Sequence, residues 1–367
     1  MTHLVLVINA GSSTFKCALF ESGQNAKDPV QIWSGSADYL PTQAGKTLKN
    51  LLAPVLNQAV SCIGHRVVHG GELFTDPTVI TPKVLQQLKK LSKLAPLHNP
   101  ANLLGIELTQ KLFPATPQLA VFDTAFHKTL PEAALTYPLP LKWKKEGIRR
   151  YGFHGISHAY CLEKSAEILV KKPSSLNLIT CHLGNGCSLT AIRGGKSVDT
   201  TMGFTPLEGL MMGSRCGSID PGIILHLLRQ GASREYLETT LNKKSGFQGI
   251  CGTNDLRKIL KLNTEEAALA LEMFRLNHLR HFGAMLASLE RLDGVVFTGG
   301  IGENSPWIRA ETAKAFPWIG MKINSTLNKK TPLDQIISAK ESKVPVILIH
   351  AREDWAIARD CERLNIF

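Results

Sequence analysis

Three glycine-rich turns in this sequence follow short apolar runs and contain residue types that bind phosphate groups. They are NAGSST at 9–14, HLGNG at 182–186 and TGGIGEN at 298–304. Glycine lets backbone N–H groups come close to an anion, and serine and threonine hydroxyls add further donors. None of the three is GxGxxG followed by a ribose-binding acid, and the sequence has no GxxxxGK followed by Ser or Thr. A dinucleotide fold and a P-loop are therefore both disfavoured.

Charged side chains that could act on an anionic substrate stand in separate motifs. Arg66 in GHRVVHGGE alternates with Val68, so a strand would place a guanidinium beside an apolar surface, which suits a short carboxylate with a small alkyl tail. Asp123 follows the apolar run LAVF, where it could cap the next segment or enter a site at the end of a strand. Arg215 in the glycine-flanked GSRCG is either a movable cation or a solvated loop charge.

Two histidine pairs have the four-residue spacing of some zinc sites. They are His65 with His69 and His154 with His158, but neither belongs to HExxH, and the first pair lies in a strand-like run. The eight cysteines are scattered without a CxxC pair, which favours reduced thiols over a disulfide framework. A zinc site built from these residues is disfavoured.

The elements that must position these residues alternate between strand-like and helix-like segments, which is typical of α/β proteins. Strands are expected at 5–8, 61–68, 119–122, 176–180, 294–298 and 344–349, and helices at 82–94, 265–289 and 354–364. The order strand, glycine-rich turn, strand, second turn occurs at 4–24 and again at 176–196. This repetition indicates two similar halves that each open with a β-hairpin, although two unrelated hairpins would look alike.

The composition excludes some classes of function. The formal net charge is +12 over 367 residues, but the basic residues are spread out and no RNP-like aromatic motif accompanies them. This pattern disfavours nucleic acid as a partner and favours the steering of small anions. No stretch approaches the roughly 20 apolar residues of a membrane span, and residues 1–10 lack a signal-like region. We therefore expect a cytoplasmic protein without a membrane partner.

The order of the motifs resembles that of acetate kinases, which belong to the acetate and sugar kinase, Hsp70 and actin superfamily. The matching blocks are NAGSSTFK, GHRVVHGGE, APLHNPAN, FDTAFH, YGFHGISH, HLGNG, VDTTMGFTPLEGLMMGSRCG and FTGGIGEN. Each block is weak alone, but the ordered set covers essentially the whole chain. The resemblance implies a duplicated actin-like, ribonuclease H-like α/β fold with two domains around a nucleotide cleft. Residues 1–126 plus 353–367 would form a discontinuous N-terminal domain closed by the last helix, and residues 127–352 the nucleotide-binding domain.

The resemblance also implies an activity, which is the reversible transfer of the γ-phosphoryl group of ATP to acetate, giving acetyl phosphate and ADP by direct in-line transfer. Mg²⁺ is the expected metal, with Mn²⁺ as a substitute, and a homodimer is expected. A propionate or butyrate kinase of the same family is the nearest alternative, because one methylene changes discrimination by only about 1–3 kcal/mol. A non-catalytic actin-like nucleotide-binding module is a further alternative, but it would have no reason to carry Arg66, His154 and Arg215 together.

Matching the motifs residue by residue implies roles for single side chains. The expected catalytic residues are Asp123, His154, Arg215 and Arg66, and the expected carboxylate site comprises Arg66, Val68, Leu97, Phe153 and Pro206. The expected ATP site comprises Ser12, Thr14, Lys16, His182, Leu183, Gly184, Asn185, Gly186, Asp255, Leu256, Arg257, Gly300, Ile301, Gly302, Glu303 and Asn304. Asn9 and Glu353 are expected to hold the metal, with Asp123 as a further candidate. Because a carboxylate nucleophile is ionised at pH 7, Asp123 is expected to act electrostatically rather than as a base.

The chain departs from the family's pattern at several of these motifs. Thr14 stands where serine is usual, and Ser218 replaces a common aspartate. GICGTNDLR replaces a serine-rich version, and HAREDW replaces the usual TNEE around Glu353. These departures bear on nucleotide preference and metal geometry more than on phosphoryl transfer.

Overall fold

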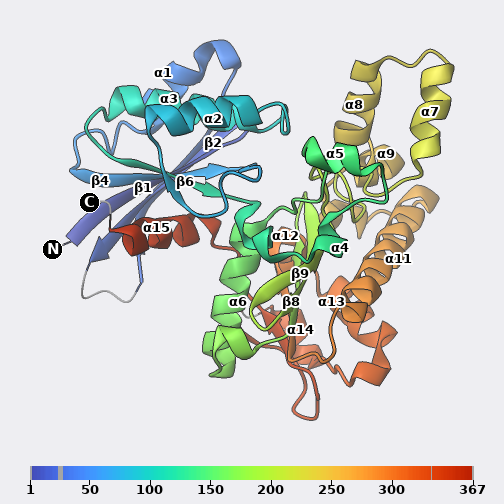
Figure 1. Cartoon of the computed structure of the whole chain (residues 1–367). Coiled ribbons are helices and arrows are strands. Elements are labelled where there is room, and N and C mark those ends of the chain that lie inside the picture. Colours follow the sequence, from blue (N-terminus) through green and yellow to red (C-terminus); the bar gives the residue numbers. More distant parts are fainter. Residues whose placement is uncertain (1, 24–27, 332, 366–367) are drawn as a thin grey trace. The chain divides into compact units, whose positions relative to one another are not determined.

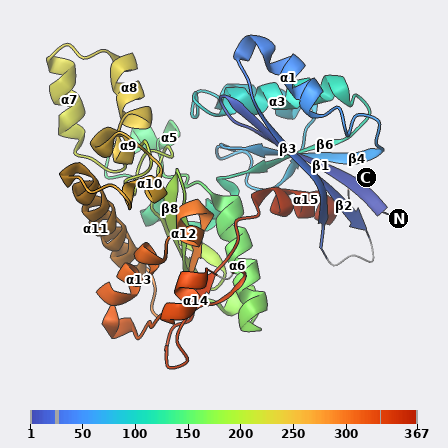
Figure 2. The same cartoon turned by 180° about the vertical axis from the view of Figure 1, so that it is seen from behind.

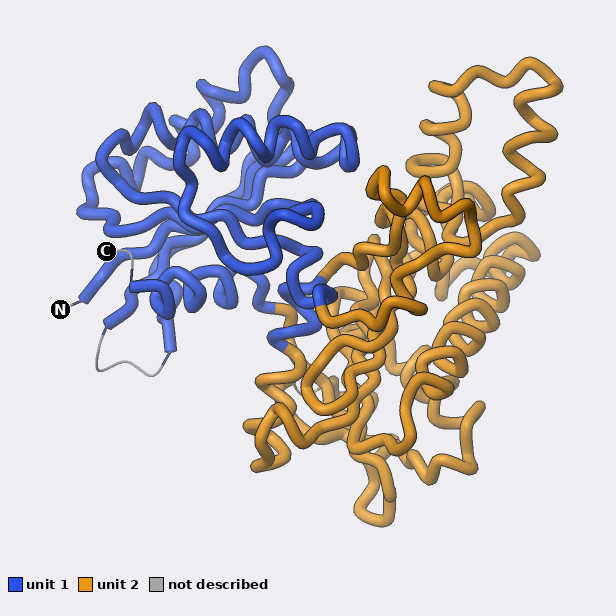
Figure 3. The backbone as a smooth tube through the Cα atoms, in the orientation of Figure 1, with its two compact units in different colours: residues 1–128, 155–160, 352–367 blue, residues 129–154, 161–351 orange. Residues whose placement is uncertain are grey.

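The structure is a computed structural model that describes residues 2–23, 28–331 and 333–365. Helices and strands alternate along the chain, as Figures 1 and 2 show. The chain forms two compact units (Figure 3): unit 1 is Met1–Lys128, Gly155–Tyr160 and Arg352–Phe367, and unit 2 is Thr129–His154 and Cys161–Ala351. These ranges differ from the expected domains at residues 127, 128 and 352, and Gly155–Tyr160 also belong to unit 1.

Unit 1 contains a six-stranded sheet in the order β3-β2-β1-β4-β6-β5. Its strands are β1 (Thr2–Ala10), β2 (Thr14–Gly23), β3 (Val30–Asp38), β4 (Val60–Val67), β5 (Thr78–Val79) and β6 (Gln118–Phe122). β1 and β2 form the expected hairpin, whose turn is the NAGSST segment. β1 pairs in parallel with β4, and β4 with β6, so the carboxyl ends of these three strands lie at one edge. Residues 5–8 of β1 are buried on both faces of the sheet, which explains the continuous apolar run there.

Helices cover both faces of this sheet. They are α1 (Ala44–Leu51), α2 (Pro82–Leu91), α3 (Asn99–Leu112), α15 (Glu353–Leu364) and the short η1 (Pro41–Gln43) and η2 (Ala125–Thr129). Figures 1 and 2 show α1 and α3 on one face and α15 on the other, where it packs against β1 and β4. β4 comes so close to α15 that a Cβ atom at Gly64 would lie 2.5 Å from the Ile357 side chain. Only glycine therefore fits at that position of β4.

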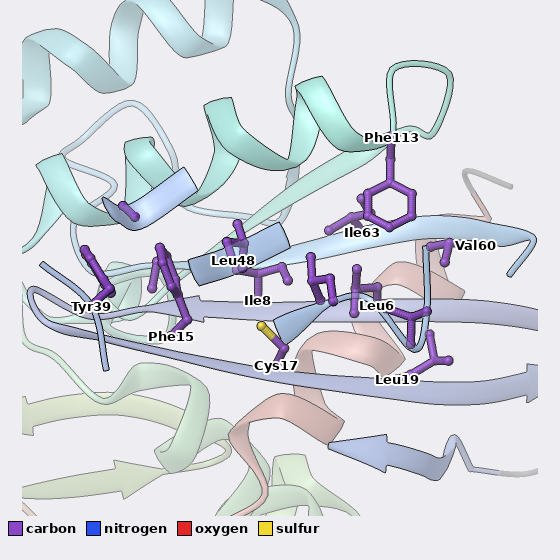
Figure 4. Close-up of a cluster of buried hydrophobic side chains, with 14 residues drawn as sticks. Leu6, Ile8, Phe15, Cys17, Leu19, Tyr39, Leu48, Val60, Ile63 and Phe113 are labelled. Carbon is purple, nitrogen blue, oxygen red and sulfur yellow. The ribbon is translucent and has the colours of Figure 1, made fainter. Parts of the chain in front are cut away.

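The core between this sheet and α1 and α3 is apolar (Figure 4). Leu6 and Ile8, two positions apart on β1, both belong to this core. Phe15 from β2 stacks on Tyr39 with ring centroids 4.2 Å apart. The spacing of Leu6 and Ile8 follows from the two-residue period of a strand. It also means that Asn9, which is out of phase with Ile8, lies on the face that α15 covers.

Unit 2 repeats the strand arrangement of unit 1. Its sheet has the order β11-β12-β10-β7-β8-β9. The strands are β7 (Leu178–Leu183), β8 (Cys187–Arg193), β9 (Lys196–Thr200), β10 (Gly294–Thr298), β11 (Gln335–Ile336) and β12 (Val346–Leu348). From β9 to β11 the pairings are antiparallel, antiparallel, parallel, parallel and antiparallel, the same series as from β3 to β5 in unit 1. The predicted duplication is confirmed.

The helices of unit 2 flank its sheet. They are α4 (Glu132–Leu135), α5 (Leu141–Lys145), α6 (Gly155–Leu169), η3 (Pro173–Ser175), α7 (Pro221–Arg229), α8 (Arg234–Lys243), α9 (Gly246–Cys251), α10 (Leu256–Ile259), α11 (Glu265–Ala287), α12 (Gly299–Asn304), α13 (Pro306–Ala315), η4 (Pro317–Ile319) and α14 (Ser325–Lys330). The first six residues of α6 belong to unit 1. α11 begins after Thr264, whose side chain accepts a hydrogen bond from Ala267 N. None of the described helices is both long and apolar enough to cross a bilayer.

Candidate active site

A buried ion pair in unit 1 joins two of the expected catalytic residues. Arg66 on β4 donates from Nε to Asp123 Oδ1 at 3.0 Å and from Nη2 to Oδ2 at 2.6 Å. Its Nη1 lies 3.7 Å from Glu353 Oε2 at the start of α15. The pairing of Arg66 with Val121 explains the contact, because Asp123 follows two residues later, just beyond the end of β6. The structure therefore brings Arg66, Asp123 and Glu353 together.

Burial and the nearby charges oppose one another at this ion pair. The Asp123 side chain is 2% exposed and that of Arg66 is 20% exposed. Burial raises the pKa of Asp123 above its ordinary value, Arg66 acts to lower it, and the charge of Glu353 raises it further, so the net shift is upward. Burial acts to lower the pKa of Arg66, but Asp123 and Glu353 outweigh it and raise that pKa. The guanidinium is therefore always charged, and removing it would leave a buried carboxyl without its main counter-charge.

The motif APLHNPAN places the segment that carries Arg66 and Val68. Asn102 accepts from Val68 N at 3.0 Å and donates to Ala10 O at 2.8 Å, which ties this segment to the end of β1. Asn99 accepts from His69 N and donates to His69 O. Sequence reasoning singled out only Leu97 in this motif. The two asparagines position the segment between β4 and α3.

The NAGSST turn of unit 1 exposes some of its polar groups and uses others internally. Gly11 N donates to Thr14 O at 2.9 Å, which closes the turn. Ser12 and Lys16 are exposed, as expected for contact with phosphate. The hydroxyl of Thr14 instead donates to Asp38 Oδ1 at 2.6 Å. The departure from serine at this position thus comes with a hydrogen bond to the neighbouring strand β3.

The expected phosphoryl-binding residues of unit 2 meet at the HLGNG turn between β7 and β8. A Cβ atom at Gly186 would lie 3.3 Å from His154 Nε2 and 3.4 Å from Arg215 Nη1, so both side chains end above this glycine. His154 has a left-handed backbone with φ 55°, a strained conformation for a residue other than glycine. Its Nδ1 lies 2.9 Å from Ser188 Oγ, and its ring stacks on His182 with centroids 4.2 Å apart. The left-handed backbone of His154 and these two contacts place its Nε2 next to Gly186.

A cavity of about 520 Å³ in unit 2 adjoins the same turn. The expected ATP residues that line it are Gly184, Asn185, Asp255, Leu256, Arg257, Gly300, Ile301 and Asn304, and Asn254, Leu260 and Ser305 complete the lining. Its volume lies in the range of small-molecule sites. Aliphatic side chains and polar groups face it together, which suits a flat base attached to a charged tail. Residues from all three expected nucleotide motifs of unit 2 therefore surround one cavity.

A family comparison accounts for this arrangement of motifs. The model of the acetokinase family matches residues 41–359 of the chain. The chain belongs to the acetokinase family. An acetate kinase from Synechococcus sp. (strain JA-2-3B'a(2-13)) is 47% identical, covering 98% of this chain and 98% of that protein. An acetate kinase from Trichormus variabilis (strain ATCC 29413 / PCC 7937) is 46% identical, covering 98% of this chain and 99% of that protein.

Solved structures of acetate and propionate kinases are similar to this acetokinase-family chain along its whole length. A propionate kinase from Francisella tularensis subsp. tularensis SCHU S4 has a TM-score of 0.87 at 37% identity and covers 98% of both chains. Porphyromonas gingivalis acetate kinase has a TM-score of 0.85 at 35% identity and covers 99% of this chain and 100% of that chain. The fold is therefore the two-domain, actin-like α/β kinase fold that the order of motifs predicted.

The other expected site residues of this acetokinase-family chain fall into two groups. In the carboxylate site, Val68 and Leu97 are partly exposed in unit 1, whereas Phe153 is buried in unit 2. Pro206, also in unit 2, accepts from Arg215 Nη1 at 3.1 Å through its carbonyl oxygen. Among the residues expected to bind ATP, Leu183, Gly302 and Glu303 are buried. The shared role predicted for Val68, Leu97, Phe153 and Pro206 stays a prediction.

The residues expected to hold a metal offer only oxygen donors. Asn9 lies on the sheet face that α15 covers, and Glu353 begins that helix with its side chain 17% exposed. Among the described residues no group of three or more His, Cys, Asp or Glu side chains is arranged to hold a metal. Mg²⁺ commonly takes one or two carboxylates and completes its shell with water and substrate phosphates. The available donors fit such an ion.

Sequence reasoning missed Asp354, the residue after Glu353 on α15. Burial and the charge of Glu353 raise the pKa of Asp354 to about 6, while Arg66 and Lys16 act to lower it. It thus adds a further carboxyl to the group around Arg66. An acidic pair at the start of an amphipathic helix was the available signal, but it equally fits a favourable charge on the helix dipole.

The departures at Ser218 and in GTNDLR also have structural partners. Ser218 Oγ accepts from Gly209 N at 3.0 Å, and Ser218 N donates to Gly209 O at 2.9 Å, so Ser218 closes the loop that carries Arg215. Asn254 donates to Asn185 Oδ1 at 3.4 Å on the wall of the cavity. Both departures therefore act on loops that carry expected site residues.

The histidines of the first pair contact other protein groups, and the cysteines form no disulfide. His65 Nε2 lies 2.9 Å from Gln118 Oε1, and His69 Nδ1 accepts from Gly71 N. Burial lowers the pKa of each of these two histidines to about 4, so they are neutral in the folded protein. All eight cysteines lie within the described residues, and none of them forms a disulfide.

Proposed function

We propose that this chain is an acetate kinase, which transfers the γ-phosphoryl group of ATP reversibly to acetate and forms acetyl phosphate and ADP. One observation carries the proposal. The HLGNG turn of unit 2 lines the nucleotide-sized cavity with Gly184 and Asn185. In the same turn, Gly186 lies next to the ends of the His154 and Arg215 side chains. The phosphoryl group of a nucleotide bound in that cavity would lie beside both donors. The relatives named acetate kinase support this choice of reaction.

The proposed transfer needs no general base, because the carboxylate of acetate is ionised at neutral pH. Arg66 would hold this carboxylate through Nη1, since Nε and Nη2 already donate to Asp123. His154 and Arg215 would donate to the equatorial oxygens of the phosphoryl group while it passes in line to the acetate oxygen. One P–O bond to the β-phosphate breaks and one P–O bond to acetate forms.

Further residues would bind the phosphates and the metal. Ser12 and Lys16 are exposed in the NAGSST turn and are proposed to contact phosphate oxygens. Asn9 and Glu353, with Asp123 as a further candidate, would hold Mg²⁺ or its substitute Mn²⁺. When bound, this ion neutralises charge on the phosphate oxygens. The oxygen-only donor set supports this assignment.

A propionate kinase is the second candidate, and the similarity to the Francisella tularensis propionate kinase structure favours it. Val68, two positions after Arg66, and Leu97 are partly exposed apolar residues of unit 1, and they suit a short alkyl tail. One additional methylene in such a pocket changes discrimination by only about 1–3 kcal/mol. The preference between acetate, propionate and butyrate is therefore a question for kinetics.

The test is ATP-dependent formation of an acyl phosphate, trapped as its hydroxamate, with formate, acetate, propionate and butyrate as acceptors. We expect the highest kcat/KM with acetate, and loss of activity after removal of Mg²⁺ by a chelator. An Arg66→Ala variant should show a raised KM for the acid. If none of the four acids gives a product, the kinase proposal is wrong, and a higher kcat/KM with propionate would overturn only the choice of acetate.

We further propose that the protein is a homodimer through exposed apolar side chains of α7 and α11 in unit 2. None of the residues of α7, all of which the structure describes, is buried. Ile223 and Leu225 of α7 are 47% and 58% exposed, and Leu269 of α11 is 56% exposed. A second copy would remove these side chains from water. Sedimentation of the wild-type protein should give a dimer and a Leu225→Glu variant a monomer, and a monomeric wild type would refute the proposal.

We also place the enzyme in the cytoplasm. The proposed reaction uses ATP and ADP, which are abundant there, and no described helix could span a membrane. Fractionation of cells that produce the protein should recover the kinase activity in the soluble fraction. Recovery in the membrane fraction would contradict this location.

A further inference from the structure

The carboxylate of Glu303 faces inward rather than toward the nucleotide cavity. Glu303 lies on α12, the helix that contributes Gly300, Ile301 and Asn304 to the cavity, but its side chain is buried. Its Oε1 accepts from Gly299 N at 3.0 Å and from Ala351 N at 2.9 Å. A side chain buried in this way acts on the nucleotide through the shape of the loop.

His350 supplies the remaining contact of Glu303. Its Nδ1 lies 2.8 Å from Glu303 Oε2. Burial acts to raise the pKa of Glu303, but the hydrogen bonds from His350 and Ala351 outweigh it and lower that pKa, so the carboxylate is ionised. An ionised carboxylate only accepts hydrogen bonds, and therefore His350 Nδ1 carries the proton. Such charge-assisted hydrogen bonds are stronger than those between neutral groups.

The backbone around His350 is itself held in place. His350 N donates to Asp334 Oδ1 at 3.0 Å, and Ile349 N donates to Phe297 O at 3.0 Å. The imidazole of His350 therefore projects from a fixed segment at the end of β12, and it can restrain the position of Glu303.

A buried arginine holds the same helix by its backbone. Arg309 Nη1 donates to Gly302 O at 2.6 Å and to Glu303 O at 2.9 Å. Arg309 is in turn held by Asn328, which accepts from its Nε and Nη2. Arg309 thus binds two backbone carbonyl groups of α12, while His350 and Ala351 bind the side chain of Glu303.

His350 and Ala351 lie only two or three positions before Glu353, a residue of the proposed metal site. Ala351 is the last residue of unit 2, and unit 1 resumes at Arg352. Glu353, two residues beyond Ala351, begins α15. His350 and Ala351 belong to the HAREDW segment, which also contains Glu353.

We propose that His350 is a positioning residue of the nucleotide site. Together with Glu303 it fastens α12 to the segment that leads into α15, and so holds Gly300, Ile301 and Asn304 in the geometry that binds the nucleotide. This inference rests on the proposed function only in taking the cavity of unit 2 as the ATP site.

The test compares three substitutions of the histidine. His350→Leu removes the donor, His350→Asn places an amide N–H near the position of Nδ1, and His350→Gln places it near that of Nε2. We expect the Leu and Gln variants to raise KM for ATP about tenfold, because a hydrogen bond to a charged group is lost. KM for acetate should change less than about twofold. The Asn variant should recover most of the affinity for ATP.

A second readout separates this inference from the proposed reaction. ADP binding by calorimetry and hydrogen exchange of the peptide covering residues 297–305 require no turnover. Weaker ADP binding and faster exchange in His350→Leu than in His350→Asn would support the positioning role even if no acid is phosphorylated. Equal ADP affinity and equal exchange in all three variants would overturn it, even if acetyl phosphate forms.

A double-mutant cycle covers the case in which His350→Leu does not fold. Glu303→Gln in the wild-type and His350→Gln backgrounds measures whether the two side chains act together on ADP binding, because His350→Gln removes the donor at Nδ1. Coupling between the two substitutions supports the positioning role. Strictly additive effects refute it.

Discussion

Replacing Arg66 by methionine should destabilise unit 1 through the carboxyl that is left behind. Methionine keeps most of the side-chain volume but removes the guanidinium that donates to both oxygens of Asp123. Because the Asp123 side chain is only 2% exposed, water cannot replace the lost donors. Removing one partner of a buried ion pair typically costs about 3–5 kcal/mol, and we expect a loss of this size near neutral pH.

A double variant provides the matched control for this prediction. In Arg66→Met/Asp123→Leu both charges are gone, and apolar replacement of a whole buried pair is often neutral within about 1 kcal/mol. The double variant should therefore regain most of the stability that the single variant loses. A loss in the double variant as large as in Arg66→Met would mean that lost packing, and not the unpaired carboxyl, causes the effect.

The dependence on pH follows from the direction of the pKa shift of Asp123. Burial raises this pKa in the folded protein, and Arg66 is the group that lowers it most. A carboxyl with a raised folded pKa contributes stability that is lost as pH rises through that pKa. Without Arg66 the folded pKa rises further. Between the folded pKa values of the wild type and the variant, the cost of Arg66→Met should shrink by about 1.4 kcal/mol for each unit that the pH falls.

Native-state hydrogen exchange of the amides of β4 and β6 is the appropriate assay. A single global melting curve would mix the unfolding of two units, whereas these amides report the opening of unit 1 alone. The free energy of opening should be measured at neutral pH and at successively lower pH. A loss below about 1 kcal/mol near neutral pH, or a loss that grows as the pH falls, would refute the reasoning.

Three further predictions concern unit 2 and the buried histidines. Ser188→Ala should lower kcat about tenfold and Ser188→Thr much less, because the hydroxyl of Ser188 holds His154 Nδ1. Steady-state kinetics measures this, with circular dichroism as the control for folding. Equal kcat values in the two variants would contradict the prediction. Gly186→Ala should lower kcat more than it raises KM for ATP, because the new methyl group meets the His154 ring at 3.3 Å, and unchanged kinetics would contradict this. Burial lowers the pKa of His65 to about 4 and that of His278 to about 3. As the pH decreases from about 6.5, each of these histidines should therefore reduce the free energy of unfolding by about 1.4 kcal/mol per pH unit. Native-state hydrogen exchange of β4 in unit 1 and of α11 in unit 2 between roughly pH 7.5 and pH 5 measures this separately for each unit, and a flat profile would contradict it.

The sequence was most informative where its apolar pattern is strong. The β1–β2 hairpin, the helix at 265–289 and the strand at 294–298 are each buried on at least one face, so their periodicity appears in the sequence. β3 (Val30–Asp38) was not expected, because this edge strand has no fully buried residue. The missing strand also explains why the partner of Thr14, which lies on β3, could not be predicted.

The candidate site could be predicted where a motif carries the chemistry, and not where a tertiary contact does. HLGNG and TGGIGEN indicate two sides of the unit 2 cavity through their glycines and polar residues alone. Ser188 looks like an ordinary strand residue, and its contact with His154 spans 34 positions. His350 and Glu303 are 47 positions apart, and neither residue type indicates the other. Contacts of this kind depend on which strands become neighbours, and local sequence does not specify that.

The place of α15 in unit 1 has a consequence for biosynthesis. β6 ends at Phe122 and α15 begins at Glu353, so about 230 residues are translated between them, which takes on the order of 10–50 s. During this time the nascent chain has an uncovered sheet face at Gly64, because Ile357 has not yet been made. Unit 2, whose last residue is Ala351, can finish folding first. The half of the protein that is synthesised first is therefore the last to close, and its open face is the surface that a ribosome-associated chaperone would need to protect.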